Sequence, residues 1–175
     1  MAINAANLKY YYSGGASNSN PTLSIGGTKS NVELSATALN NLFDNVTGDE
    51  ATSGYDEYRL LYFQNIDTDA DGLMDPVVLW IVAQPAGDDS MEVGLSTQGK
   101  NAVATAIADD HTAPAEVTFH EEITKEGGID FVTVGIAMPF SQNDYIGIWF
   151  HRHVPAGASL QASDGFQWRI EGDTI

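Results

Sequence analysis

The chain has 175 residues, of which 43% are hydrophobic and 18% are charged. This length suits one domain with a sizeable core, and the composition is too apolar for a disordered acidic segment. The 24 Asp and Glu residues outnumber the 7 Lys and Arg residues, which gives a formal net charge of −17. Because so acidic a surface repels phosphate, we expect no nucleic-acid partner.

The sequence contains no cysteine, which excludes disulfides, zinc–thiolate sites and a cysteine nucleophile. The first twenty residues lack the basic start and apolar core of a secretory signal. No stretch reaches the ~18 apolar residues that a membrane span needs. We therefore expect synthesis in a cytoplasm and no membrane partner.

Short segments rich in Val, Ile, Tyr, Phe and Trp predict β-strands. In chain order they cover residues 8–12, 57–65, 77–84, 92–96, 116–120, 131–136, 145–154 and 166–171. Turn signals such as Asp71-Gly72 and Asp164-Gly165 separate them. The pattern predicts an all-β fold, an antiparallel β-sandwich of jelly-roll or immunoglobulin-like type.

One short helix is predicted near residue 40. Ser35 or Thr37 would cap its start and Gly48 would end it. The apolar residues at helical spacing are Ala38, Leu39, Leu42, Phe43 and Val46. A weaker helical pattern covers residues 101–108.

Residues 1–30 are predicted to form an N-terminal strand followed by an arm, and residues 31–175 the β-sandwich domain. Residues 13–30 are rich in Gly, Ser and Asn, so we expect this arm to be flexible or ordered by a partner. Three adjacent aromatics, Tyr10, Tyr11 and Tyr12, cannot all face one side of a strand. At least one of them should be exposed or contact a neighbouring chain.

The sharpest local motif is an acidic loop whose candidate metal ligands are Asp67, Asp69, Asp71, Leu73 and Asp75. Alternating carboxylates and the Leu73 carbonyl would offer hard oxygen ligands, as in the first nine positions of an EF-hand-type calcium loop. Val78 stands at position twelve, so the usual bidentate Glu is missing and binding would be weak, on the order of 10⁻⁴ to 10⁻³ M. A Ca²⁺ site and a solvated hairpin loop are the two interpretations.

His151 and His153 share one face of a predicted strand, where two imidazoles could bind one metal. No third ligand follows at suitable spacing, so a surface strand end or a subunit contact is favoured. Trp80 and Trp149 have apolar flanks and are expected in the core. The candidate partner-binding residues are Tyr10, Tyr11, Tyr12, His151 and His153.

No catalytic motif stands out. The sequence lacks a G-x-S-x-G nucleophile elbow and a phosphate-binding glycine loop followed by Lys. Its carboxylate pairs are adjacent in sequence and do not face each other across a cleft by spacing alone. We expect a protein that is not an enzyme.

Three segments resemble a family of small virion structural proteins of tailed bacteriophages. They are residues 12–18 with Gly26-Gly27, residues 41–44 continuing to 58–62, and residues 148–157. The closing residues 171–174 also fit, whereas the acidic loop looks like an addition. Together these segments cover about half of the chain. They are spread from its start to its end and do not form one local motif.

The resemblance implies a capsid decoration (cement) protein that lies on the capsid exterior of the virion after synthesis in the host cytoplasm. Its partners would be the major capsid protein and further copies of itself, as a homo-oligomeric dimer or trimer. The alternative is a tail- or fibre-associated, calcium-dependent carbohydrate-binding module. Exposed Trp and Tyr side chains together with the acidic loop motivate that alternative.

Overall fold

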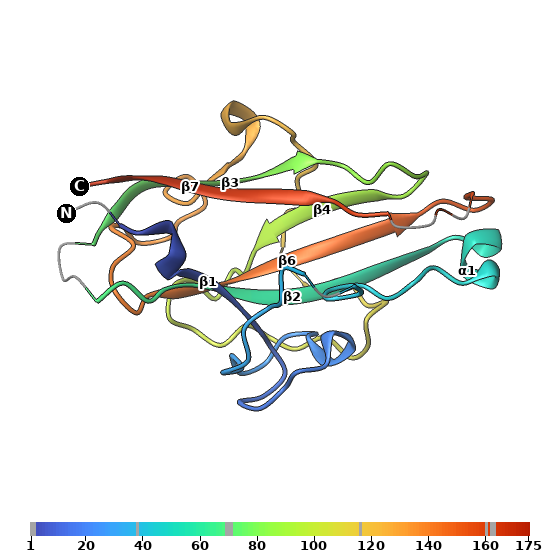
Figure 1. The fold of residues 1–175 in the computed structure, drawn as a ribbon, viewed down its shortest axis with the longest axis horizontal. Helices are drawn as coiled ribbons and strands as arrows, with labels where there is room; N and C mark the ends of the chain where they lie inside the picture. The colour runs from blue at the N-terminus through green and yellow to red at the C-terminus, as the bar shows by residue number, and fades with distance from the viewer. Residues whose placement is uncertain (1–2, 38, 69–71, 116, 160, 162–163) are drawn as a thin grey trace.

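The computed structural model describes residues 3–37, 39–68, 72–115, 117–159, 161 and 164–175. Its strands form two antiparallel sheets, which confirms the predicted all-β sandwich (Figure 1). The first sheet has the order β1-β2-β6-β4 and the second the order β5-β3-β7. The first sheet contains β1 (Leu8–Tyr12), β2 (Tyr55–Asn65), β6 (Tyr145–Val154) and β4 (Ser90–Leu95); the second contains β5 (Ile129–Asp130), β3 (Met74–Ala83) and β7 (Gln167–Thr174).

The longest pairing joins β2 to β6, from Tyr55 opposite Val154 to Gln64 opposite Tyr145. Both strands are buried along most of their length. Their successive side chains point to opposite faces, so burial of both faces explains the apolar runs at residues 60–63 and 145–150. These two strands are the centre of the first sheet.

The main core lies between the two sheets. It takes alternate residues from β2, β3, β4 and β6: Leu61, Phe63, Leu79, Ile81, Val93, Ile148 and Phe150. The predicted burial of Trp80 and Trp149 is confirmed, since both are largely inaccessible to solvent. Trp149 belongs to a second cluster on the other face of the first sheet.

Residues 97–115 and 117–120, which we call the cover, pack over that other face. They lie over Tyr58, Leu60, Tyr62 and Trp149. Gly94 in β4 lets the cover approach closely, because a Cβ there would lie 2.5 Å from Cγ1 of Val117. The hydroxyl of Tyr62 donates a hydrogen bond to the Gly27 carbonyl (2.6 Å) and accepts one from the Ala104 N–H (2.8 Å). One side chain thereby joins two covering segments to the sheet.

The segment at residues 13–30 packs against β2 in this structure. The Ser13 hydroxyl donates to the Leu60 carbonyl (3.0 Å) and accepts from the Gly26 N–H (3.1 Å). Gly26 has a φ of +99° and would clash with Ala106 if it carried a Cβ. The arm that we expected to be flexible or ordered by a partner makes these contacts within its own chain. It includes η2 (Pro21–Leu23) and follows η1 (Ala5–Asn7) and β1.

The prediction of one short helix is confirmed, but its predicted position, between a cap at Ser35 or Thr37 and a stop at Gly48, is wrong. The helix is α1 (Gly48–Ser53), which begins after Thr47 through reciprocal bonds between Thr47 and Glu50. This is a capping box, and it makes Gly48 the first helical residue rather than a helix stop. Leu42 and Phe43 are buried from an irregular segment, whereas Leu39 is 89% exposed. Their spacing reflects loop packing; Ala38 lies outside the described residues.

Three other elements also differ from the prediction. Residues 131–136 form a turn after β5, closed by the Ile136 N–H on the Phe131 carbonyl (2.8 Å), and only the turn's two ends are buried. In the described part of residues 116–120, pairing is limited to a bridge between His120 and Val93; Glu116 lies outside that part. Residues 101–108 contain a bridge at Ala104 and no helical turn. In each case apolar side chains pack from irregular backbone, which periodicity does not distinguish from a regular element.

The remaining helical turn is η3 (Lys125–Gly127). Within the described part of the chain, no helix has the length and hydrophobicity that a membrane crossing requires. The predicted bounds of β1 and β6 match the structure.

Candidate functional site

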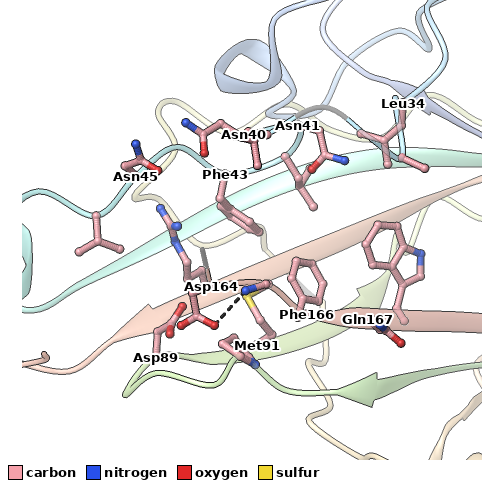
Figure 2. A pocket seen from close by; sticks show the side chains of 18 of the residues that line it. Leu34, Asn40, Asn41, Phe43, Asn45, Asp89, Met91, Asp164, Phe166 and Gln167 are labelled. Carbon is pink, nitrogen blue, oxygen red and sulfur yellow. Dashed lines mark hydrogen bonds between the residues drawn. The ribbon is translucent and has the colours of Figure 1, made fainter. Parts of the chain in front are cut away.

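A groove of about 1060 Å³ runs along one side of the sandwich. Figure 2 shows Asn40, Asn41 and Phe43 on one side of it, facing Asp164 and Phe166 on the other. The first wall comes from β1 and the segment after it, and the second from the loop after β3 and the start of β7. The groove therefore lies where one edge of each sheet meets the other.

Aromatic rings form the apolar part of the groove. The Tyr10 ring meets Trp168 edge to face at 5.4 Å, and Trp168 lies 5.2 Å from Phe166. Phe166 in turn lies 6.4 Å from Phe43 across the groove. Burial raises the pKa of the Tyr10 hydroxyl above its ordinary value. These side chains offer a large apolar surface with polar groups at its margin.

Amide side chains line the rim. Those of Asn40, Asn41, Asn45 and Gln167 all line the groove, as Figure 2 shows. The backbone carbonyl of Asn41 accepts a hydrogen bond from the Tyr12 hydroxyl (2.9 Å), which anchors this rim to β1. The amide side chains of the rim can donate hydrogen bonds to a bound molecule and accept hydrogen bonds from it.

One end of the groove is acidic, with Asp88, Asp89 and Asp164 side by side in the lining. The Asp164 carboxylate accepts the backbone N–H groups of Ala86 (2.8 Å) and Gly87 (3.0 Å). Burial tends to raise the pKa of Asp164, but these bonds hold it below its usual value. Burial and the Asp164 carboxylate raise the pKa of Asp89 to about 6. Asp89 therefore keeps its proton longer than an exposed carboxyl as pH rises.

A buried ion cluster lies next to the groove, and its Arg152 forms part of the lining. Arg152 donates to the Asp44 carbonyl (2.8 Å) and the Tyr55 hydroxyl (2.6 Å), and its guanidinium lies 4.8 Å from the Phe43 ring. Glu57 accepts from both Arg152 and the fully buried Arg59. Removing one member of such a cluster leaves a buried charge unpaired, so the cluster fixes this end of the sandwich.

His151 and His153 lie away from the groove and share one carboxylate. The Nε2 of His151 and the Nδ1 of His153 each lie 2.8 Å from an oxygen of Asp56. The Nδ1 of His151 lies 2.6 Å from Glu92, and its ring stacks on Tyr58 at 4.5 Å. Burial tends to raise the pKa of Asp56, but the two imidazole bonds outweigh it and lower the pKa. The predicted shared face is present, and the cross-strand Asp56 joins the two rings.

The structure places part of the predicted calcium loop. Asp67 is buried and accepts from the Asn4 N–H (3.2 Å) and from Nδ2 of Asn7 (3.1 Å). The Leu73 carbonyl accepts from the Ile175 N–H (3.2 Å), and Asp75 is half-buried. Asp69 and Asp71 lie outside the described residues. Among the described residues, no three His, Asp or Glu side chains gather to hold a metal ion. The Ca²⁺ site stays a prediction.

The three adjacent tyrosines have separate environments. Tyr10 lines the groove, Tyr12 is buried in the main core, and Tyr11 lies on the opposite face with the Lys29 ammonium 4.1 Å from its ring centre. Of the predicted partner-binding residues, Tyr10 alone lines the groove. Sequence reasoning missed most of the lining, because it comes from positions as distant as Lys9 and Trp168.

Comparisons with protein-family models, with curated proteins and with solved structures give no match. Function is therefore inferred from the groove and from the sequence segments described above.

Proposed function

We propose that this chain is a non-enzymatic structural protein of a tailed-phage virion, specifically a decoration (cement) protein. It would bind the outside of the capsid and bridge subunits of the major capsid protein. The observation that supports this proposal is spatial: the segments that resemble such virion proteins are far apart in sequence but contiguous in the fold.

Five contacts join the parts of these segments. Ser13 and Gly26 bond to each other, and Ser13 also bonds to Leu60 in β2. β2 pairs with β6 along its length. The Arg152 side chain reaches the Asp44 carbonyl (2.8 Å), and the Gly157 N–H reaches the Ala51 carbonyl (2.8 Å). Proteins that share a fold and a structural role would be expected to resemble one another in segments that form one unit of the fold, as these segments do.

The charge and the fold suit the proposed role. A net charge of −17 limits self-aggregation and contact with packaged nucleic acid. A protein that binds only assembled subunits stabilises the assembly by linkage, without chemistry. Copies would associate as a dimer or trimer at local symmetry axes of the shell.

The test is occupancy of purified particles. Particles would be imaged with a label fused to this chain, and shells with and without the chain would be heated until they release DNA. We expect label density on the capsid exterior and a higher release temperature when the chain is bound. Particles that lack the chain, or shells that release DNA at the same temperature with it, would contradict the proposal.

A second candidate is a calcium-dependent carbohydrate-binding module of a tail or fibre. The aromatic and amide side chains that meet in the groove favour it, because sugar rings stack on aromatic faces. A glycan array probed with the protein, with and without a calcium chelator, distinguishes the two candidates. Binding that the chelator abolishes, together with label density on the tail, would favour this second candidate.

A further inference from the structure

The edges of the two sheets are covered to different extents. In the first sheet, β1 is bordered by the segment after it: the Tyr12 N–H bonds to Val32 (3.2 Å) and the Leu34 N–H to Tyr10 (2.8 Å). At the other edge of that sheet, Val93 and His120 exchange two backbone bonds of 2.9 Å. Covered edges of this kind cannot pair with another chain.

β7 is the last strand of the second sheet and pairs on one side with β3. Among the described residues, no backbone group pairs with its other side. The strand has eight residues, and its start borders the groove through Gln167 and Trp168. A strand edge next to an apolar groove is a template for an added strand.

The hydrogen-bond pattern identifies which β7 groups face outward. Bonds from Ile81 to Glu122 and from Phe131 to Val77 turn odd-numbered residues of β3 toward β5. Even-numbered residues of β3 therefore bond to β7, where Val78 faces Glu171 and Trp80 faces Arg169. By the same alternation, the N–H and C=O groups of Trp168 and Ile170 face the open edge.

Two further features mark the groove beside this edge as incomplete. The indole Nε1 of Trp168 is buried, and its contact with the Tyr10 hydroxyl falls short of a hydrogen bond of ordinary geometry. Leu39, on the opposite rim, is 89% exposed although it is apolar. An occupant that covered Leu39 and accepted from the indole would remove both costs.

Charge indicates the chemistry of the occupant. One end of the groove carries Asp88, Asp89 and Asp164. The two cations in the lining are already paired within the chain, Lys9 with Glu33 (2.8 Å) and Arg152 with Glu57. A Lys or Arg of the occupant would complement the acidic end. A second copy of this chain, at a net charge of −17, is a poor electrostatic match.

We propose that the open edge of β7 receives an extended, basic segment of a partner protein as an added strand. Backbone bonds to Trp168 and Ile170 would supply affinity, while alternate apolar side chains would enter the groove. A basic side chain would lie against Asp88. This inference rests on the proposed function, in which the segment belongs to the major capsid protein, and it extends the second sheet from three strands to four.

The experiment uses the full chain and a yeast-displayed library of random twelve-residue peptides. We expect selected peptides to alternate apolar and polar residues and to carry Lys or Arg near one end. On adding a selected peptide, the amides of Trp168 and Ile170 should gain protection from hydrogen exchange, and the Trp168 indole resonance should shift. A library without binders, or protection of β4 instead of β7, would overturn the proposal.

Matched variants separate charge and hydrogen bonding from folding. Asp88→Asn should weaken binding of a selected peptide about 2- to 5-fold, as expected for one exposed charge pair. Glu126→Gln removes an exposed charge in η3 and should leave affinity unchanged. Trp168→Phe keeps the aromatic ring and removes the indole donor, so it should weaken binding about 2- to 10-fold. Equal affinities for all four proteins would also overturn the proposal.

Particle binding distinguishes failure of this inference from failure of the proposed function. If Asp88→Asn and Trp168→Phe proteins occupy particles like the wild type, the capsid role stands and the β7 docking site is wrong. If the wild type binds selected peptides but is absent from particles, the docking site stands and the capsid role is wrong. If β7 resonances respond to glycans and to no peptide, the groove binds sugar and the inference is wrong.

Discussion

Two aromatic surfaces of this protein have similar chemistry but differ in exposure: one is buried and the other half-buried. On the outer face of the first sheet, Tyr58, Tyr62 and Trp149 lie beneath the covering residues 97–115 and 117–120. On the open side of the sandwich, Tyr10 and Trp168 line a groove. The chain therefore closes one aromatic surface itself and leaves the other accessible. Coverage by the chain's own loops, rather than aromatic content, distinguishes a core from a candidate binding surface.

Truncating the closed surface should have the largest effect. Trp149→Ala removes a side chain that is 1% exposed, and we expect it to lower the free energy of unfolding by about 3–5 kcal/mol. On the open side, Leu39→Ala should change it by less than about 0.5 kcal/mol. Urea denaturation of both variants measures this difference, and equal effects would refute the contrast between the two surfaces.

The contribution of the buried ion cluster around Glu57 to stability can be measured by removing one of its charges. Glu57→Gln leaves the guanidinium groups of Arg59 and Arg152 without their buried carboxylate. We expect a loss of about 3 kcal/mol in the free energy of unfolding, because the two guanidinium groups lose their closest carboxylate and keep only the more exposed Asp110 and Asp44. Denaturant melts give this value. A loss below about 1 kcal/mol, the range of an exposed ion pair, would show that this cluster is solvated.

The close approach of the cover to β4 can be disturbed with one methyl group. In Gly94→Ala, the new Cβ would lie 2.5 Å from Val117 and 2.7 Å from the Thr118 carbonyl. We expect a destabilisation of about 2 kcal/mol and faster proteolysis of the cover. Gly165→Ala, on the open side, meets no atom within 4 Å and should change stability little. Similar thermal melts for the two variants would argue against tight packing of the cover.

The acidic end of the groove should give the smallest effect, and one that depends on pH. The folded pKa of Asp89, about 6, exceeds its ordinary value of 3.8. The folded state therefore binds more protons between these values, and the free energy of unfolding falls as pH rises through this window. Asp89→Asn should remove that slope and stabilise the protein at pH 7 by about 1 kcal/mol, after allowance for solvent screening. Melts between pH 4 and 8 test it; an unchanged slope would rule out Asp89 as its source.

The sequence was most informative where burial is two-sided and regular. The bounds of β6 could be predicted because its Ile, Trp, Phe and Val side chains are buried on both faces. The segment around Leu42 and Phe43 misled because loop residues that seal a core can show helical spacing by coincidence. At Gly48 the glycine suggested a helix end, but the Thr47–Glu50 capping box, a four-residue pattern, marks a helix start.

The candidate site was largely invisible in the sequence. Tyr10 was singled out as an unusual aromatic, but its groove neighbours Phe43, Phe166 and Trp168 come from distant segments. Their approach depends on sheet order, which a single sequence does not reveal. The pairing of His151 with His153 could be predicted from their alternation, whereas their shared partner Asp56 follows from the register of β2 against β6.

The phenolic oxygen of Tyr62 has a consequence for local opening of the fold. It bonds at once to Gly27 in the N-terminal segment and to Ala104 in the cover, and the Gly27 N–H also bonds to the Ala104 carbonyl (2.9 Å). Neither the N-terminal segment nor the cover can move away from the sheet without breaking a bond that holds the other. The two segments should therefore detach as a single foldon, with their amides exchanging with deuterium at a common rate.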